Sequence, residues 1–228
     1  MTNNIIGIYT SLLVTPQRAF AAALNKKVWT LFFPLLMAIL ITAAINICYY
    51  NMVDMPWLLK QMVANVPKDQ KQVILDSLTK TRLVSISLVG VFVLTVSINL
   101  FRAFVYWFIL KVGGEAVRFV RLFAIVMWAT APLLVILPAS VLNIYMNASG
   151  MLPNDVNPVS INQLMFRFPG DSAWGQLLST FSLINIWEVF LIVIGLRLAT
   201  TKKTGAAVLI AIMPEVIVYG LWSALLAI

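Results

Sequence analysis

The chain has 228 residues, of which 61% are hydrophobic and 11% are charged, and its formal net charge is +8. Its mean hydropathy is +0.95. A water-soluble domain of this length cannot bury so much apolar surface. Several apolar runs approach the roughly 20 residues that a helix needs to cross the hydrocarbon core of a bilayer. The sequence therefore predicts an all-α, polytopic integral membrane protein.

The charges and the rare residue types argue against several function classes. Lysines and arginines cluster at the ends of the apolar runs. This distribution is typical of membrane topology signals and of contact with anionic lipid headgroups, and it is atypical of nucleic-acid binding. The chain has no histidine and one cysteine, Cys48, which argues against a metal or haem cofactor. No nucleophile accompanies a base, and "VGGE" reads as a turn and not as a phosphate cradle. We predict no catalytic residue and no enzyme activity.

Residues 1–27 are predicted to form an interfacial helix on the membrane surface. Thr15 is a good N-cap, Pro16 suits the first helical position, and Phe20 and Leu24 share one face. Three basic residues supply positive charge: Arg18, Lys26 and Lys27. A short water-exposed lead-in is the alternative.

Five apolar runs predict five spans in a single domain, residues 1–228. The predicted spans are 28–50, 83–112, 119–145, 177–198 and 206–228. Residues 51–81 alternate apolar and charged side chains, which predicts one or two extramembrane amphipathic helices broken at Pro67. Gly113 and Gly114 are predicted to end the second span, and the polar loop after the third to pack back on the bundle. Three prolines predict kinks within spans: Pro132, Pro138 and Pro214.

The distribution of lysine and arginine predicts a cytoplasmic N-terminus and an external C-terminus. Nine of these residues lie before the first span and in the turns after the second and fourth. Six lie in the loops on the other side, and none follows the last span. Short basic loops favour the cytoplasmic side.

Three charges inside the apolar runs are predicted to lie at one depth. Glu188 is fourteen residues before Lys202, the tip of the hairpin between the last two spans, and Glu215 is thirteen residues after it. Arg102 is twelve residues before Gly114. At 1.5 Å per residue, each lies around 20 Å from a turn on the same side. Two asparagines are predicted about one turn further out: Asn99 and Asn185.

Two interpretations of this layer remain open. It can be a structural bridge that fixes how three spans pack, because an intramembrane charge needs a partner or a wet cavity. It can also be a functional site, because two carboxylates that share one cation allow one of them to hold a proton. A third arrangement, in which Arg102 extends past Tyr106 to the headgroups, would weaken both interpretations.

The order of features resembles bacterial members of the Ypt-interacting-protein (Yip) domain family, which are five-span membrane proteins. The resemblance covers nearly the whole chain: "TPQRAF", a first span, a polar amphipathic segment, "GGEAVRFVRLFAIVMWATAPLLV", and "FSLINIWEVFLIVIGLRLATTKKTGAAVLIAIMP". Eukaryotic members bind Rab-type GTPases and shape vesicle traffic. The Asp-Leu-Tyr-Gly-Pro stretch and long N-terminal region of those members have no counterpart in these residues, which argues against GTPase binding.

The resemblance implies a non-enzymatic protein of the bacterial inner membrane that organises the membrane or recruits partners. Membrane lipids and a membrane or cytosolic protein are the expected partners. The alternative is a small transporter, channel or lipid-moving protein that uses the Arg/Glu layer. A proton, solute or lipid assay in liposomes separates the two classes.

Overall fold

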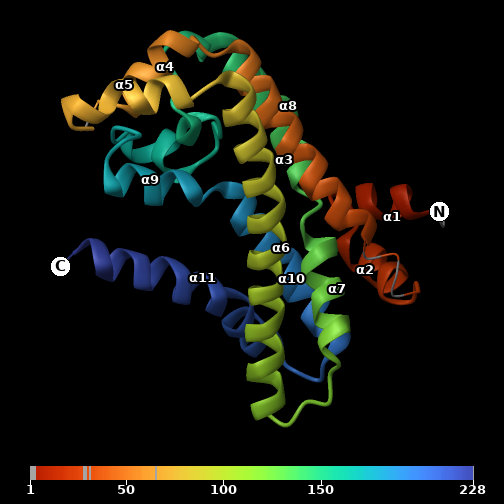
Figure 1. Cartoon of the computed structure of the whole chain (residues 1–228). Helices are drawn as coiled ribbons and strands as arrows, with labels where there is room; N and C mark the ends of the chain where they lie inside the picture. Colours follow the sequence, from red (N-terminus) through yellow and green to blue (C-terminus); the bar gives the residue numbers. More distant parts are fainter. Residues whose placement is uncertain (1–3, 28–29, 31, 65, 228) are drawn as a thin grey trace. The chain divides into compact units, whose positions relative to one another are not determined.

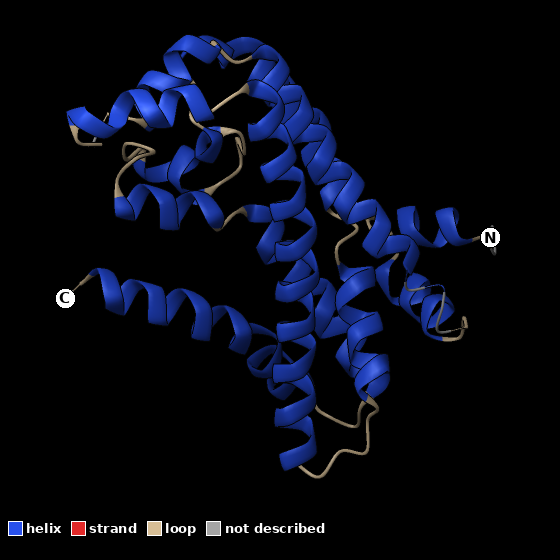
Figure 2. Ribbon diagram, viewed as in Figure 1, coloured by secondary structure: helices blue, strands red, loops and turns tan. Residues whose placement is uncertain are grey.

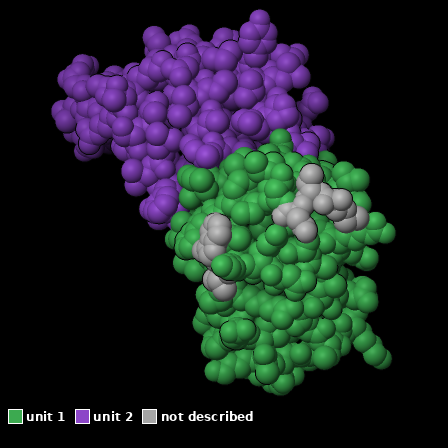
Figure 3. All heavy atoms as spheres, turned by 90° about the vertical axis from the view of Figure 1, so that its right-hand side faces the viewer, with its two compact units in different colours: residues 1–39, 94–134, 183–228 green, residues 40–93, 135–182 purple. Residues whose placement is uncertain are grey.

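The computed structural model describes residues 4–27, 30, 32–64 and 66–227. Figure 2 shows helices joined by loops, and the described residues contain one isolated β-bridge, between Ser160 and Ser182, and no strand. The predicted all-α class is confirmed. The chain divides into two compact units, which Figure 3 shows in different colours. Unit 1 contains residues 1–39, 94–134 and 183–228, and unit 2 contains residues 40–93 and 135–182.

Four helical segments are long and apolar enough to cross a membrane among the described residues. They are α3 (Phe32–Met52), α6 (Lys80–Val112), the segment Phe119–Gly150, and α11 (Thr204–Leu226). The predicted first span begins at residue 28, which lies outside the described residues. α10 (Leu183–Ala199) has 17 residues, which is the lower limit for a transmembrane helix. The count of five spans therefore stays a prediction that depends on α10.

The predicted fourth span begins too early in the sequence. Residues 177–180 belong to a separate helix, α9 (Ala173–Thr180), and α10 begins only at Leu183. Between them the chain is extended, with Phe181 at φ −98° and ψ 129°. The carbonyl of Phe181 accepts a hydrogen bond from the Ile161 N–H at 2.8 Å. A pairing with a distant loop thus breaks an apolar run that reads as continuous.

The third apolar segment is broken at a proline. α7 (Phe119–Ala129) ends before Pro132, and α8 (Leu133–Asn147) begins directly after it. Pro132 lies in the turn between the two helices, whereas Pro138 lies inside α8 and Pro214 inside α11. A proline lacks the N–H that the helix ladder needs, so the break at Pro132 is expected.

The core of unit 1 is built from buried residues of the N-terminal helices and of α6, α7, α10 and α11, which Figure 1 labels. α1 (Ile5–Ser11) and α2 (Pro16–Leu24) pack against each other, and α2 also contacts α7 and α10. Trp128 is the largest fully buried side chain among the described residues, and its ring centroid lies 6.1 Å from that of Tyr9. Burial raises the pKa of Tyr9 to about 12, so its phenol is neutral at physiological pH.

The N-terminal segment differs from its prediction in one detail. α2 begins at Pro16 as expected, but the Thr15 side chain makes no capping hydrogen bond. Its hydroxyl donates instead to the Ser11 carbonyl at 3.4 Å. Phe20 is fully buried inside unit 1, so this apolar face contacts protein. A position of α2 at the membrane interface stays a prediction.

Unit 2 contains the predicted amphipathic segment and the long polar loop. α4 (Met55–Met62) and α5 (Lys68–Ser77) are separated at Pro67, as predicted, and Asp54 caps α4 through the Trp57 N–H. The loop forms the short helical turns η2 (Ala148–Gly150), η3 (Pro153–Asp155) and η4 (Asn162–Phe166) before α9. Asn162 is fully buried: its amide donates to the Phe168 carbonyl and to the Ser179 hydroxyl.

Tyr49 of α3 ties the polar loop to its unit. Its hydroxyl is buried and donates to the Met151 carbonyl at 2.9 Å, so Tyr49→Phe leaves a buried acceptor without this bond. We expect the free energy of unfolding to fall by about 1 kcal/mol. Tyr50→Phe is the matched control, because among the described residues the Tyr50 hydroxyl has no hydrogen-bond partner. Unfolding in mixed micelles compares the two, and an equal loss in both contradicts the assignment.

Candidate functional site

Arg102 binds two carboxylates inside unit 1. α6 carries Arg102, α10 carries Glu188, and α11 carries Glu215. Arg102 Nη1 lies 2.8 Å from Glu188 Oε2, and Arg102 Nη2 lies 2.6 Å from Glu215 Oε1. The exposed fractions of the three side chains are 9%, 8% and 13%. The structure thus brings together the three charges that the sequence places at one depth.

The guanidinium suits this arrangement because its N–H groups form a rigid planar fork. Each of its two terminal nitrogens faces a carboxylate on a different helix. Lysine carries a single compact ammonium and would not hold the two carboxylates in a fixed geometry. Arg102 therefore acts as a clamp on α10 and α11, the two helices of the C-terminal hairpin.

The two contacts of Arg102 are unequal. Nη1 donates a hydrogen bond to Glu188 Oε2. Glu215 Oε1 is closer to the guanidinium but, among the described residues, has no partner with hydrogen-bond geometry. We describe the first contact as a hydrogen-bonded ion pair and the second as an ion pair only. One cation faces two carboxylates, so the fully ionised layer carries a net charge of −1.

The two predicted asparagines lie about one turn from these charges. Asn99 is buried on α6, where its amide donates to the Thr95 carbonyl at 2.7 Å. Its side-chain oxygen has no hydrogen-bond partner among the described residues. Asn185 lies on α10, three residues before Glu188.

Tyr106 belongs to the same layer, a role that the sequence analysis did not assign. It is fully buried on α6, and its hydroxyl donates to the Ala211 carbonyl of α11 at 3.0 Å. Its position four residues after Arg102, on the same helix face, is the signal that could have identified it. Extension of Arg102 past Tyr106 to the headgroups is therefore wrong: the guanidinium is buried against the two glutamates.

The two predicted basic turns of unit 1 lie next to each other. α6 ends directly before Gly113 and Gly114, as predicted. The structure shows how: Gly114 has φ +79°, and the Glu115 N–H donates to the Leu110 carbonyl, which is a Schellman motif. Thr201 donates a 2.6 Å hydrogen bond to Glu115 Oε1, and Lys202 Nζ donates to the Gly113 carbonyl. The turns after α6 and α10 are thus on one side of unit 1, as the topology requires.

The contact between Thr201 and Glu115 predicts a pH dependence. The hydrogen bond from Thr201 lowers the pKa of Glu115 below its ordinary value. The stabilisation is therefore present above that ordinary value and is lost as the pH falls through the lowered pKa. We expect Thr201→Val to lower the thermal midpoint at neutral pH and to match the wild type in acid. Thr200→Val is the control, because the Thr200 hydroxyl donates to the Leu196 backbone carbonyl and not to Glu115. The effect of this substitution should therefore be the same at neutral and at acidic pH.

The predicted basic residues lie at the two ends of α2. Arg18 lies in the first turn of α2 and, with Pro16 and Phe190, lines one cavity of unit 1. Lys26 and Lys27 follow the helix and line a second cavity. Neither of these two cavities is lined by Arg102, Glu188 or Glu215. Among the described residues, no group of three His, Cys, Asp or Glu side chains could hold a metal ion.

The charge layer can do one of two things chemically. As a closed set of ion pairs, it fixes the packing of α6, α10 and α11. As a cation shared by two carboxylates, it can hold a proton on one of them. The pairing geometry is common to both uses.

Comparison with known proteins places the chain in a family. A stretch of 125 residues is 27% identical to "Membrane protein YknW" of Bacillus subtilis (strain 168). This stretch covers 54% of this chain and 51% of that protein. The chain therefore matches about half the length of this curated relative. No solved structure matches. Residues 10–226 match the Yip1 domain, which is almost the full length of the fold described above. The chain belongs to the Yip1 family of membrane proteins.

Proposed function

We propose that this protein is a non-enzymatic scaffold of the bacterial inner membrane, which organises the membrane or recruits partners from its cytoplasmic face. The observation that carries the proposal is the Arg102 clamp. Both carboxylates of the layer contact the guanidinium, so the charges join three helices. This use of intramembrane charge requires neither a substrate nor a catalytic group.

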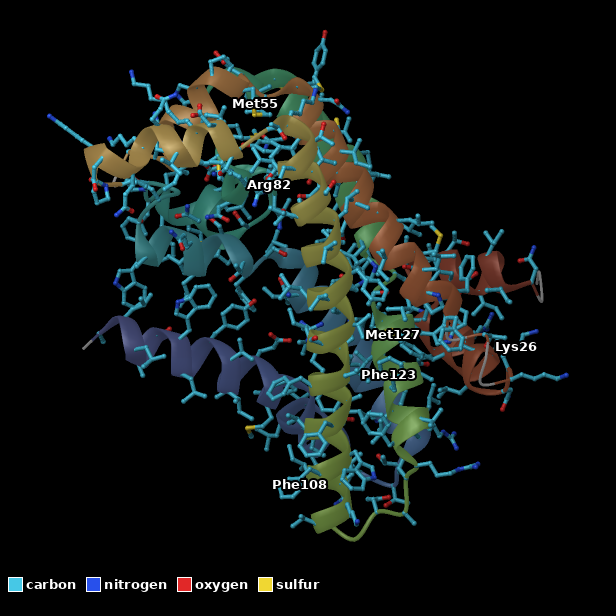
Figure 4. The ribbon with its side chains drawn as sticks, viewed as in Figure 1. Lys26, Met55, Arg82, Phe108, Phe123 and Met127 are labelled. Carbon is cyan, nitrogen blue, oxygen red and sulfur yellow. The ribbon has the colours of Figure 1, made fainter. Side chains whose placement is uncertain are left out.

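Two further features support a scaffold. Large apolar side chains are exposed along α6, among them Phe92, Phe104 and Phe108 (Figure 4 labels Phe108), and an exposed apolar face suits contact with lipid or with another membrane protein. Unit 1 contains ten of the sixteen lysines and arginines but only three of the eight acids. Its excess positive charge suits anionic lipid and acidic partner surfaces.

Photo-crosslinking in cells tests the recruitment of partners. A crosslinker at Arg18 or Lys203, on the proposed cytoplasmic face, is expected to give discrete protein adducts that recur between preparations. A crosslinker at Phe108, which is exposed on α6, is the control for lipid-facing positions. Adducts that are diffuse at all three positions contradict the recruitment of a defined partner.

The orientation has its own test. Topology reporters fused after Lys203 and after residue 227 are expected to report opposite sides of the membrane, because α11 has 23 residues and is apolar. The reporter after Lys203 is expected on the cytoplasmic side, where positive loops are favoured. The same side for both reporters contradicts the proposed path of the last helix.

The second candidate is a proton-coupled transporter or lipid-moving protein. The ratio of two carboxylates to one guanidinium, with Glu215 held by an ion pair only, favours this candidate, because a single guanidinium compensates the charge of only one carboxylate. In liposomes, the scaffold predicts proton, solute and lipid movement equal to that of empty vesicles. Movement above that background, and its loss in Glu215→Gln, would replace the scaffold with the transporter.

A further inference from the structure

A pocket in unit 1 combines four cations with an apolar wall. Its volume is about 340 Å³, and it lies between the end of α2 and the beginning of α7. Lys26, Lys27, Arg118 and Arg121 line it, together with apolar residues that include Ala124 and Trp128. The pocket is bordered by α2 and α7. In Figure 4 the label Lys26 marks the end of α2, and the labels Phe123 and Met127 mark α7.

Among the described residues, no acid of unit 1 forms an ion pair with Lys27, Arg118 or Arg121. Unit 1 contains three glutamates: Glu188 and Glu215 contact Arg102, and Glu115 contacts Lys202. All residues that line the pocket within the described chain are basic, hydroxyl-bearing or apolar. These three positive charges line one cavity without a paired carboxylate and repel one another. A bound anion removes this repulsion.

The first turn of α7 adds to the positive potential. Arg118 occupies the N-cap position and makes no side-chain capping bond there. The first N–H groups of a helix carry partial positive charge and bind phosphate oxygens well. Val120 and Arg121 of this turn line the pocket. The α7 N-terminus and the side-chain cations thus act on the same space.

The polar and apolar parts of the pocket follow the axis of α7. Arg118 directly precedes a segment that is long and apolar enough to cross a membrane, and Arg121 lies at its beginning. Ala124 and Trp128 lie further along this segment. Ten residues separate Arg118 from Trp128, about 15 Å along a helix. A ligand that fits is anionic at one end and apolar at the other.

We propose that this pocket binds the phosphate headgroup of an anionic phospholipid, with the beginning of an acyl chain against Ala124 and Trp128. Lys27, Arg118 and Arg121 contact the phosphate, and Lys26 contributes charge at the rim. The site is independent of whether the Arg102 layer is structural or proton-coupled, because it shares no residue with that layer.

The full-length protein in neutral detergent tests the site by native mass spectrometry. The probes are phosphatidylglycerol, cardiolipin, phosphatidylcholine and inorganic phosphate. We expect both anionic lipids to bind more tightly than phosphatidylcholine. Near a membrane each Lys or Arg contributes enough to change affinity by about fivefold, so Lys27→Gln/Arg118→Gln/Arg121→Gln should weaken binding by roughly a hundredfold.

Two further variants identify the source of the effect. Arg18→Gln/Arg197→Gln/Lys203→Gln removes the same charge from unit 1 outside the pocket, and we expect its lipid affinity to stay within about threefold of the wild type. Ala124→Leu keeps every charge and fills the apolar part of the pocket. It should weaken phospholipid binding by about tenfold and leave inorganic phosphate binding unchanged.

Three results would overturn the proposal. Equal losses in the pocket and control triple variants would assign lipid binding to the general positive charge. Phosphatidylcholine binding equal to that of the anionic lipids would exclude headgroup selection. The pocket would be a site for free phosphate if inorganic phosphate bound as tightly as lipid and Ala124→Leu changed neither affinity. If the pocket triple variant does not fold, Ala124→Leu decides the outcome alone.

Discussion

Arg102→Leu is expected to lower the free energy of unfolding by about 3–5 kcal/mol, because it leaves buried carboxylates without their cation. Glu188 and Glu215 both contact Arg102, at 2.8 Å and 2.6 Å. Without Arg102, both carboxylates stay largely buried, with 8% and 13% of their side chains exposed, and lose the cation that they share. Unfolding in mixed micelles, or the folded yield after extraction, measures the loss.

Recovery needs both glutamates to change. From the sequence, the expectation is that Arg102→Leu with one paired Glu→Gln recovers folding. The structure alters that expectation, because one change still leaves a buried carboxylate. Arg102→Leu/Glu188→Gln/Glu215→Gln removes every charge of the layer, and we expect it to regain most of the lost stability.

Arg82→Leu is the control for these variants. Arg82 is an exposed cation on α6, and its replacement should change stability by about 0.5 kcal/mol or less. If the Arg102→Leu protein is as stable as this control, Arg102 does not clamp α10 and α11. If the neutral triple variant folds and keeps its biological activity, the layer is structural. If it folds and loses activity, the layer takes part in function.

The depth of the charge layer was predictable because helices convert residue number into length. Counting from Lys202 and from Gly114 places Glu188, Glu215 and Arg102 at similar heights, and the ion pairs join them. The count says nothing about rotation around each helix axis. That rotation determines which guanidinium nitrogen contacts which carboxylate and allows the hydrogen bond from Tyr106 to Ala211. These contacts could not be predicted from the sequence.

Some helix ends could likewise be predicted from the local sequence, and one could not. Gly114 and Pro132 act through their own backbone, so the end of α6 and the break before α8 follow from the local sequence. The break before α10 depends on the Ile161 N–H meeting the Phe181 carbonyl, a contact between segments twenty residues apart. Apolar run length cannot report such a contact. The fourth span was consequently predicted six residues too early.

The close approach of α7 and α10 is the second feature that the sequence does not reveal. Gly195 lies in the C-terminal half of α10 and is a weak helix former in an otherwise apolar run. A Cβ added at Gly195 would lie 2.5 Å from Ile125 Cγ2, well inside van der Waals contact. Ile125 is fully buried on α7 and, being β-branched, cannot easily rotate away.

Gly195→Leu is therefore expected to lower the free energy of unfolding by about 3 kcal/mol, at the upper end for overpacking a core. Gly220→Leu is the matched control, because a Cβ at Gly220 has no atom within 4 Å among the described residues. It also removes a glycine from a helix, which is neutral or slightly stabilising.

A compensating change in Ile125 shows that the clash is with that side chain. Ile125→Ala alone leaves a cavity and should cost about 2–5 kcal/mol. In Gly195→Leu/Ile125→Ala the new side chain occupies that space, so the two losses should not add, and the coupling energy should be about 1–3 kcal/mol. Additive losses would mean that Gly195 is needed for a reason other than contact with Ile125. The close approach matters beyond stability, because α10 carries Glu188, and a helix displaced from α7 would no longer present this carboxylate to Arg102.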